Sequence, residues 1–333
     1  MSVKDSVLKV LSESKSSDGF VSGQELAEKC GVTRTSVWKA VEALRKQGAG
    51  IEAVTNRGYR LTGDGIFSEE KITKILLQSG VNNVKIQFYN VIDSTNTEAK
   101  RQLAIKTAAE LHKTVFVAAE QTAGRGRLGR KFFSPSKTGI YLSIVYSPGA
   151  ITNPALFTAT AAVAVCRAIS HVFGVEAKIK WVNDIFINGS KVCGILTEGV
   201  CNFETGLIES AIIGIGINIA NNSELPQDVA GGVISGNENN TKRSELAAGV
   251  ISELLSILDG GKESIKKSME EYKSRSFLIG QEINVSPVIG QTENDYICKV
   301  LDITEEAKLV VELEDGSKKT LDCGEVSIHS KKM

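Results

Sequence analysis

A run of alternating glycine and arginine, Gly124-Arg-Gly-Arg-Leu-Gly-Arg130, narrows the possible folds more than any other part of this chain. Its glycines match the spacing of the dinucleotide-binding fingerprint, in which the loop opens a helix and an acidic residue follows about 20 positions later. Neither condition holds, because Lys131-Phe-Phe-Ser-Pro135 leads into another predicted strand and the next acidic residue is Glu176. The Gly-Lys-Ser/Thr ending of a P-loop is also missing. We therefore predict a loop whose arginines, and not a helix N-terminus, meet an anion.

The charge balance around this loop is uneven. From Gln121 through Val175 the chain has no Asp or Glu, although six Lys and Arg residues fall in the same stretch. A region with charge of one sign focuses a positive potential. A second basic segment follows at Lys180-Trp-Val-Asn-Asp184. Together the two segments predict a site for an acidic ligand.

Composition excludes disordered and strongly charged classes of protein. The chain has 333 residues, of which 42% are hydrophobic and 23% are charged, and its net charge is zero. These values are typical of a globular protein with two or three domains. The first 62 residues are mildly basic, with 10 Lys or Arg against 7 Asp or Glu.

Cysteine usage and the N-terminus favour the cytoplasm. The six cysteines include no Cys-x-x-Cys pair, and the chain has three histidines. We therefore predict reduced packing cysteines and no metal bound by protein side chains alone. The N-terminus lacks the apolar core of a signal peptide, and no stretch approaches the ~20 apolar residues of a membrane span. We expect a cytoplasmic protein with no membrane partner.

The first sixty residues predict three helices and a small hairpin. Val7, Leu8 and Leu11 share one face of the first helix, and Ser22-Gly-Gln-Glu25 is a capping-box pattern that opens the second. Cys30-Gly-Val-Thr33 predicts the turn before the third helix, with glycine at its C′ position and threonine at the next N-cap.

The third helix has the residues of a recognition helix. Short polar and basic side chains lie near its N-terminal, outward side: Arg34, Thr35, Ser36 and Lys39. The hairpin after it, residues 51–61, carries Arg57 at its tip. We favour a DNA-binding winged helix-turn-helix, and the alternative is a three-helix packing module with incidental charge. Trp38 is expected in the core.

Residues 62–65, Thr-Gly-Asp-Gly, predict a linker. We therefore assign residues 1–62 to the DNA-binding domain, 66–276 to a mixed α/β domain and 280–330 to a small β-barrel domain. Helices are predicted at 95–111, 154–173, 244–258 and 263–274, and strands at 114–119, 140–146, 185–187, 192–196 and 211–217. Asn188-Gly189 is a type I′ hairpin signal between two of these strands.

Six motifs occur in one order along the chain. They are Asp93-Ser-Thr-Asn96, Gln121-Thr-Ala-Gly-Arg-Gly-Arg127, Gly129-Arg-Lys131, Lys180-Trp-Val-Asn-Asp184, Lys191-Val-Cys-Gly-Ile-Leu196 and Gly214-Ile-Gly-Ile-Asn218. In these motifs the chain resembles the bifunctional biotin protein ligases that also repress the biotin operon, and the resemblance spans essentially its whole length. It implies an α+β protein with a winged helix-turn-helix, a central domain of the biotin/lipoate ligase type and a C-terminal SH3-like β-barrel.

The resemblance implies a two-step reaction with biotin and ATP as substrates and Mg²⁺ on the triphosphate. The biotin carboxylate attacks the α-phosphate to give biotinyl-5′-AMP. A lysine of a biotin carboxyl carrier protein, of acetyl-CoA carboxylase or another biotin-dependent carboxylase, then takes the biotinyl group. Two anions meet in the first step, so cationic side chains must stabilise the charge. By likeness to the family these are Lys180, Arg125 and Arg127.

The resemblance also implies the ligand contacts. It assigns biotin to Ser94, Thr95, Asn96, Gln121, Gly124, Arg125, Arg127, Lys180, Gly194 and Gly216. It assigns the nucleotide to Arg127, Arg130, Phe132, Lys180, Asn183 and Asn218. Each group has a structural alternative, since Ser94-Thr-Asn96 alone predicts a helix cap and the glycines alone predict turns. Trp181 is interpreted as a packing residue.

Two positions depart from the family pattern. Val182 stands where many members have proline, and Phe132 stands where the founding repressor type has tryptophan. The first change removes a φ constraint beside Lys180, and the second leaves a smaller ring for the adenine. Neither removes a required charge, so we expect activity to survive.

The likeness implies a biotin-responsive repressor that binds operator DNA, and we expect it to form a homodimer when the adenylate orders the loop at 124–131. Two other functions stay open at this stage. One is a regulator that senses a small acid without catalysis, and the other is a lipoate ligase. The arginine-rich loop and the N-terminal winged helix favour biotin over lipoate.

Overall fold

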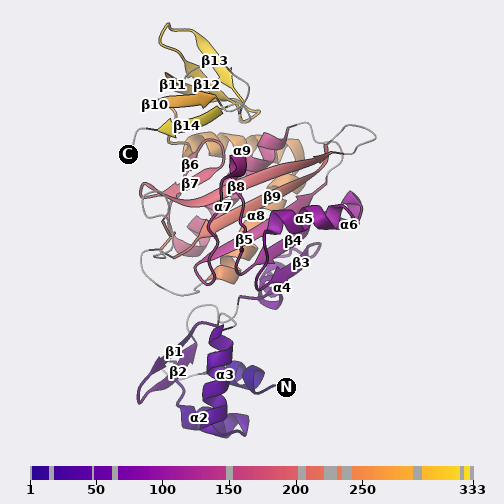
Figure 1. The fold of residues 1–333 in the computed structure, drawn as a ribbon, viewed down its shortest axis with the longest axis vertical. Coiled ribbons are helices and arrows are strands. Elements are labelled where there is room, and N and C mark those ends of the chain that lie inside the picture. Colours follow the sequence, from indigo (N-terminus) through magenta and orange to yellow (C-terminus); the bar gives the residue numbers. More distant parts are fainter. Residues whose placement is uncertain are drawn as a thin grey trace.

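The structure is a computed structural model that describes residues 2–14, 19–46, 49–61, 67–147, 153–201, 208–220, 231–234, 242–287, 295–322 and 326–330. Figure 1 shows three units along the long axis: a small helical unit at the N-terminal end, a central sheet with its helices, and a small β unit at the C-terminal end. The predicted linker at 62–65 lies outside the described residues.

The N-terminal unit has its own core, separate from the rest of the chain. It contains α1 (Val3–Ser12), α2 (Gly23–Cys30), α3 (Arg34–Lys46) and the hairpin of β1 (Ile51–Val54) and β2 (Gly58–Leu61). The Ser22 side chain caps α2, and Gly31 ends it with a φ of 65°. The Thr33 hydroxyl accepts a hydrogen bond from the Ser36 backbone and so caps α3. The predicted order of helix, turn, helix and wing is confirmed.

One prediction for this unit is wrong. Trp38 is 55% exposed, whereas the buried face of α3 consists of Val37, Ala40, Val41 and Leu44. Trp38 follows Val37 by one residue, which is about 100° around a helix, so the two side chains cannot share one face.

The central unit is built on a seven-stranded sheet in the order β3-β4-β5-β9-β8-β7-β6. Its strands are β3 (Lys85–Tyr89), β4 (Thr114–Ala118), β5 (Gly139–Tyr146), β6 (Lys178–Lys180), β7 (Asp184–Ile187), β8 (Ser190–Cys201) and β9 (Ile208–Asn218). The pair of β3 and β4 is parallel and the other neighbours are antiparallel. Asn188 and Gly189 have φ values of 49° and 78°, which fit the predicted type I′ turn between β7 and β8.

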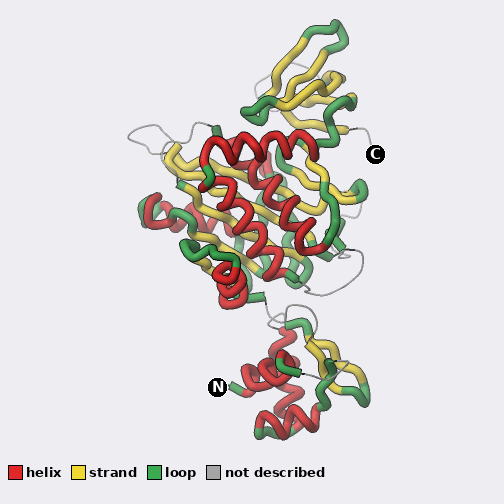
Figure 2. Tube along the Cα trace, turned by 180° about the vertical axis from the view of Figure 1, so that it is seen from behind, coloured by secondary structure: helices red, strands yellow, loops and turns green. Residues whose placement is uncertain are grey.

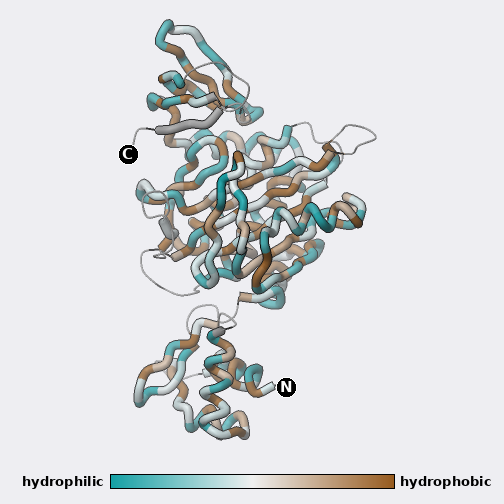
Figure 3. Tube along the Cα trace, viewed as in Figure 1, coloured by the Kyte–Doolittle hydropathy of each residue, from teal (hydrophilic) through white to brown (hydrophobic). Residues whose placement is uncertain are grey.

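Helices cover both faces of this sheet. Figure 2 shows α7 (Pro154–Phe173), α8 (Arg243–Asp259) and α9 (Gly261–Arg275) over one face, and Figure 1 shows α5 (Thr95–Leu103) in front of the other. The short α6 (Ala108–Leu111) follows α5, and α4 (Glu69–Gln78) precedes β3. Figure 3 shows hydrophobic stretches along the central strands, whereas α5 is largely hydrophilic.

The predicted helix over 95–111 is two helices. A turn separates α5 from α6, and Thr107 forms a complete capping box with Glu110 at the start of α6. A capping box supplies side-chain acceptors to two backbone N–H groups at the start of a helix. These two hydrogen bonds favour a new helix start at Thr107 over a continuous helix.

Helix α7 is long and apolar enough to cross a membrane by length and composition. In this fold, 67% of its most apolar window is buried inside the protein, where it packs with α8 and the sheet. It is a core helix of the central unit.

The C-terminal unit is a five-stranded antiparallel sheet in the order β13-β12-β11-β10-β14. The strands are β10 (Glu282–Pro287), β11 (Tyr296–Ile303), β12 (Leu309–Glu312), β13 (Lys318–Leu321) and β14 (Val326–Ser330). The turn between β11 and β12 faces the central unit, because the indole Nε1 of Trp181 donates to the Ala307 carbonyl at 2.8 Å. Asn153 donates to the Glu306 carbonyl at 3.0 Å in the same turn.

Candidate active site

A cavity of about 500 Å³ opens on the face of the sheet that carries α5. The two basic segments of the sequence both reach it, although 49 residues separate Arg130 from Lys180 in the chain. Residues of α5, the loop 121–134, β5, β6, β7, β8 and β9 line it. The cavity is therefore assembled from all six motifs.

The loop 121–134 folds back on itself as one wall of the cavity. The Gly126 backbone N–H donates to the Arg130 carbonyl at 2.8 Å, and the Phe132 N–H donates to the Gly124 carbonyl at 3.0 Å. Closer to its base, the Gln121 N–H donates to the Ser134 carbonyl at 3.0 Å. Residues 131–138, which follow the arginines of the loop, contain no helix. The next element is β5, which begins at Gly139. This confirms the prediction that the glycine motif is not a dinucleotide-binding turn.

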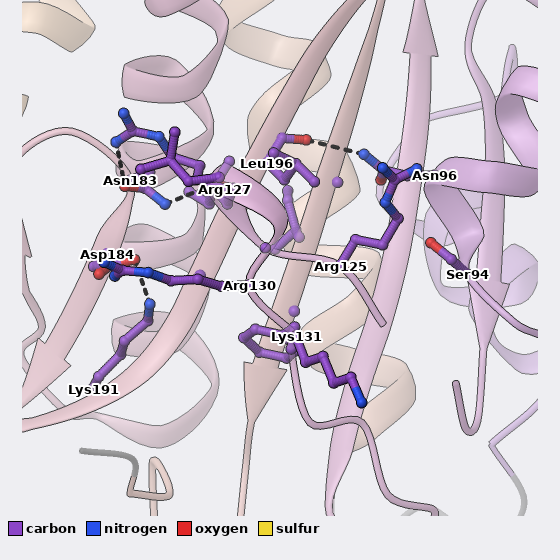
Figure 4. A pocket seen from close by; sticks show the side chains of 18 of the residues that line it. Ser94, Asn96, Arg125, Arg127, Arg130, Lys131, Asn183, Asp184, Lys191 and Leu196 are labelled. Carbon is purple, nitrogen blue, oxygen red and sulfur yellow. Dashed lines mark hydrogen bonds and ion pairs between the residues drawn. The ribbon is translucent and has the colours of Figure 1, made fainter. Parts of the chain in front are cut away.

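One end of the cavity is basic. Lys180, Lys191, Arg127 and Arg130 all line it. Arg127 donates to the Asn183 side-chain oxygen at 3.1 Å, and Lys191 forms an ion pair with Asp184 at 2.6 Å (Figure 4). Burial lowers the pKa of Lys180, the charges of Lys191 and Arg130 lower it further, and Asp184 opposes the shift. A ligand anion placed here would relieve the repulsion among these cations.

The other end is polar, and Arg125 is the cation that lies there, beside Asn96 (Figure 4). Ser94 caps α5 by accepting from the Thr97 N–H at 3.4 Å, so it is a helix cap and a cavity residue at once. Thr95 and Asn96 are 3% and 5% exposed. The Gln121 side-chain oxygen accepts from the Thr95 N–H at 2.9 Å, and the Gln121 amide donates to Ser134 at 2.9 Å. Ordered polar groups of this kind can bind an uncharged polar ring.

Glycines of β8 and β9 form the floor. A Cβ at Gly216 would lie 2.4 Å from the Phe132 ring, and one at Gly194 would lie 3.2 Å from it. A Cβ at Gly214 would lie 2.0 Å from the Asn96 side-chain oxygen. The three glycines are therefore needed by the side chains that stand over them, in addition to any ligand.

Two of the predicted site residues do not line the cavity, and the other residues assigned to biotin and nucleotide do. Gly124 is buried in the loop, where a Cβ would lie 2.3 Å from the Phe132 carbonyl. Asn218 is buried at the end of β9, and its carbonyl accepts from the Val233 N–H at 3.0 Å. Their motifs are intact, but the structure places both residues behind the wall of the cavity.

Among the lining residues that the site prediction left out, three carry a charge and one is a glycine of the floor: Lys131, Asp184, Lys191 and Gly214. All four fall inside motifs quoted for the resemblance, so the signal was present. Asp184 and Lys191 were missed because their pairing spans the β7–β8 hairpin, whose turn brings the two side chains to 2.6 Å.

The described residues contain no group of three His, Cys, Asp or Glu side chains that could hold a metal ion. Asp184 is the one carboxylate among the described residues that line the cavity. Mg²⁺ commonly binds through one or two carboxylates together with substrate phosphates and water. This donor set fits Mg²⁺ that arrives with a triphosphate and does not form a protein cage.

The N-terminal unit offers a second candidate site. Arg34, Thr35 and Lys39 are exposed on α3, and Ser36 is half-buried. The guanidinium of Arg57, at the wing, lies 4.3 Å above the Phe20 ring. The exposed side of α3 and the wing thus carry the polar and basic groups predicted to meet DNA.

Families of known proteins match the N-terminal and the central unit. A family model described as the biotin/lipoate A/B protein ligase family matches residues 88–218, and one described as an HTH domain matches residues 7–60. The bifunctional ligase/repressor BirA of Bacillus spizizenii is 35% identical over 317 residues, which cover 92% of this chain and 93% of that protein. BirA of Escherichia coli is 31% identical over 320 residues, which cover 93% and 94%.

Solved structures agree with these relatives. The biotin protein ligase from Aquifex aeolicus in complex with biotin and ATP superposes with a TM-score of 0.60 at 25% identity. The match covers 74% of this chain and 99% of that one. This chain therefore belongs to the family of bifunctional biotin ligase/repressor proteins.

Proposed function

We propose that biotin and ATP react in the cavity between the loop 121–134 and the floor of β8 and β9. As a family member the chain is a biotin protein ligase that carries a helix-turn-helix repressor domain. The observation that supports this location best is the division of one cavity into a basic end and a polar end. Two reacting anions need the first, and the uncharged ring of biotin needs the second.

In the first step a carboxylate oxygen of biotin attacks the α-phosphorus of ATP, and the bond to pyrophosphate breaks. Arg125, Arg127 and Lys180 stabilise the negative charge that gathers on the phosphoryl oxygens. Lys191 joins them in this proposal, because its ammonium lines the same end of the cavity and is held by Asp184. Mg²⁺, when bound to the triphosphate, neutralises part of its charge.

In the second step the amine of an acceptor lysine attacks the carbonyl of biotinyl-5′-AMP, AMP leaves, and the amine loses a proton. We propose a biotin carboxyl carrier protein as the acceptor. The loop 121–134 keeps water from the anhydride while the acceptor approaches, since it forms the wall over the glycine floor.

We propose a different ligand contact for Phe132 from the nucleotide contact implied by the resemblance. The ring lies against Gly194 and Gly216, both assigned to biotin, and we therefore place it beside biotin instead of adenine. Arg130 and Asn183 keep the nucleotide assignment, because both line the basic end. Asn218 and Gly124 act through the shape of the strand and loop that carry them.

The DNA-binding and cellular roles complete the proposal. Arg34, Thr35, Ser36, Lys39 and Arg57 contact operator DNA, with α3 in the major groove. We place the protein in the cytoplasm, where the five cysteines of the described residues, all free, stay reduced. Adenylate bound under the loop favours a homodimer, and sedimentation that is identical with and without biotin plus MgATP would contradict this.

The decisive experiment for the ligase uses the pure full-length protein with biotin, MgATP and a biotin-acceptor domain, followed by a blot for covalent biotin. We expect labelling by wild type and its loss in Arg125→Ala and Lys180→Ala. Biotin-dependent exchange of labelled pyrophosphate into ATP isolates the first step. If wild type shows neither labelling nor exchange, the chain is not an active ligase.

A further inference from the structure

Arg243 lies in the interior of the central unit, outside the cavity. It is the first residue of α8 and is 2% exposed. Figure 2 shows α8 over the face of the sheet opposite α5, so this side chain approaches the strands from behind the cavity. A buried guanidinium is costly unless its N–H groups find acceptors. Its hydrogen-bond partners therefore show what Arg243 holds in place.

Two backbone carbonyls accept hydrogen bonds from Arg243, and they flank the loop 121–134. Its Nε donates to the Gly139 carbonyl at 2.7 Å, and its Nη2 donates to the Ala119 carbonyl at 3.3 Å. Ala119 directly follows β4, and Gly139 is the first residue of β5. The guanidinium thus joins the two ends of the segment that carries the loop.

The pairing of β4 and β5 ends short of this point. Their last paired residues are Ala118 and Tyr141. Beyond them, the Ala119 N–H donates to β3 and Gly139 pairs with β9, so each end of the segment is held by its outer neighbour. Arg243 supplies the bonds between the two ends. A planar fork of donors suits this position, because it reaches two carbonyls at once.

Phe67 packs under the same guanidinium. The Arg243 Cζ lies 4.1 Å from the centroid of the Phe67 ring, and Phe67 is 4% exposed. A cation over an aromatic face is attracted by the ring, most strongly where water is excluded. Phe67 directly precedes Ser68, the N-cap of α4, and is the first described residue after the hairpin of the N-terminal unit. The segment that follows the N-terminal unit therefore packs on the cation that holds the loop.

We propose that Arg243 is a positioning residue for the first step of the reaction, which joins the two ends of the loop 121–134 and so places the loop's arginines over the cavity. The Phe67 ring fixes the guanidinium from below. The inference rests on the proposed function, in which those arginines meet the phosphate. Arg243 acts through the backbone of the loop and touches no ligand. Displacement of Phe67 then loosens the loop, which connects the segment after the N-terminal unit to catalysis.

The test follows the loop both without and with substrates. Trypsin cleaves after the loop's own arginines, Arg125, Arg127 and Arg130. The ratio of cleavage there to cleavage in the rest of the folded, full-length chain reports how often the loop opens. Exchange of labelled pyrophosphate into ATP, counted per active site from the burst of biotinyl-5′-AMP, gives KM and kcat for the first step.

Three variants change the contact in different ways. Arg243→Lys keeps the charge without the planar fork, and Arg243→Met removes both. Phe67→Leu leaves the arginine in place and removes the aromatic face. The matched control is Arg167→Lys on α7, which alters a half-buried arginine that pairs with Glu253 and Glu271 on the helices behind the sheet.

In Arg243→Met we expect the cleavage ratio to rise about tenfold, the value of one hydrogen bond from a charged donor. We expect kcat/KM for exchange to fall about tenfold to a hundredfold with a higher KM for ATP, as when reacting groups are misplaced by about 1 Å. Arg243→Lys and Phe67→Leu should show smaller changes of the same sign, and Arg167→Lys should show none. A purely structural role would lower the number of active sites and leave the KM and the cleavage ratio unchanged.

A wild-type KM together with a wild-type cleavage ratio in Arg243→Met would overturn the inference and leave the ligase assignment standing. If that variant does not fold, the same two wild-type values in Phe67→Leu would overturn it. Cleavage needs no substrate, so its result is independent of activity. Wild-type protein without exchange activity would overturn the proposed function, whereas a raised cleavage ratio in Arg243→Met would still support the hold of Arg243 on the loop.

Discussion

Trp181 connects the catalytic domain to the C-terminal unit, and its removal should disturb both. The side chain is 5% exposed, lines the cavity, and follows Lys180 in the chain. Its indole N–H donates to the Ala307 carbonyl at 2.8 Å, and Ala307 is 1% exposed. Trp181→Phe keeps an aromatic ring in the wall but leaves this buried carbonyl without its donor.

The expected cost follows from that orphaned carbonyl. An unsatisfied buried polar group destabilises a fold by about 1–3 kcal/mol, which is a factor of roughly 5 to 150 in the equilibrium that docks the C-terminal unit. The smaller ring adds a packing loss of the same sign. We therefore expect Trp181→Phe to unfold at a lower urea concentration than wild type. We also expect faster proteolytic cleavage between the central and C-terminal units. Because Trp181 neighbours Lys180, kcat for pyrophosphate exchange should fall as well.

The chain supplies its own control, since it has two tryptophans. Trp38→Phe makes the same substitution at a side chain that is 55% exposed, where effects are usually within about 0.5 kcal/mol. Both variants are measured by circular dichroism in urea and by exchange kinetics. If Trp181→Phe matches Trp38→Phe in stability and in kcat, the bond to Ala307 does not support the site.

Three further outcomes follow from the structure. Burial lowers the pKa of Lys180 from its ordinary value of 10.5, so kcat/KM for exchange, which reports the free enzyme, should decline with rising pH at a midpoint below 10.5. Unfolded lysine keeps its proton to higher pH, so the free energy of unfolding in urea should rise across the same window, and Lys180→Met should abolish that rise. Gly216→Ala would place a Cβ 2.4 Å from the Phe132 ring and should weaken biotin binding in calorimetry, whereas Gly249→Ala, with 3.4 Å to its nearest neighbour, should not. Lys39→Ala should reduce the slope of log K against log salt for operator DNA by about 0.9 in a gel-shift titration, and an unchanged slope would remove Lys39 from the phosphate contacts.

Local signals in the sequence predicted much of the fold. The helix at 154–173 and the turn at Asn188-Gly189 were found at their observed positions, because proline at a helix start, glycine at its end and an Asn-Gly pair act within a few residues. The same kind of signal was available at Thr107, where a capping box interrupts the predicted helix. Apolar residues continue on both sides of the break, at Leu103 and Leu111, so periodicity alone predicts one helix there.

Long-range contacts were beyond such signals. The motifs predicted which segments form the site, but they did not show that Asp184 and Lys191 pair, or that Gly214 makes room for Asn96. Ser143 appears in no motif, because it lies in the middle of a buried strand of ordinary composition. Its hydroxyl becomes informative only when α5 places two polar side chains beside it.

The motif glycines make room for atoms of the protein itself. From the sequence, Gly124, Gly194 and Gly216 all allow a ligand to approach the backbone. In the structure, Gly124 instead makes room for the Phe132 carbonyl, and the other two make room for the Phe132 ring. A ligand on this floor must share it with that ring or displace it, because Phe132, Gly194 and Gly216 line the same cavity.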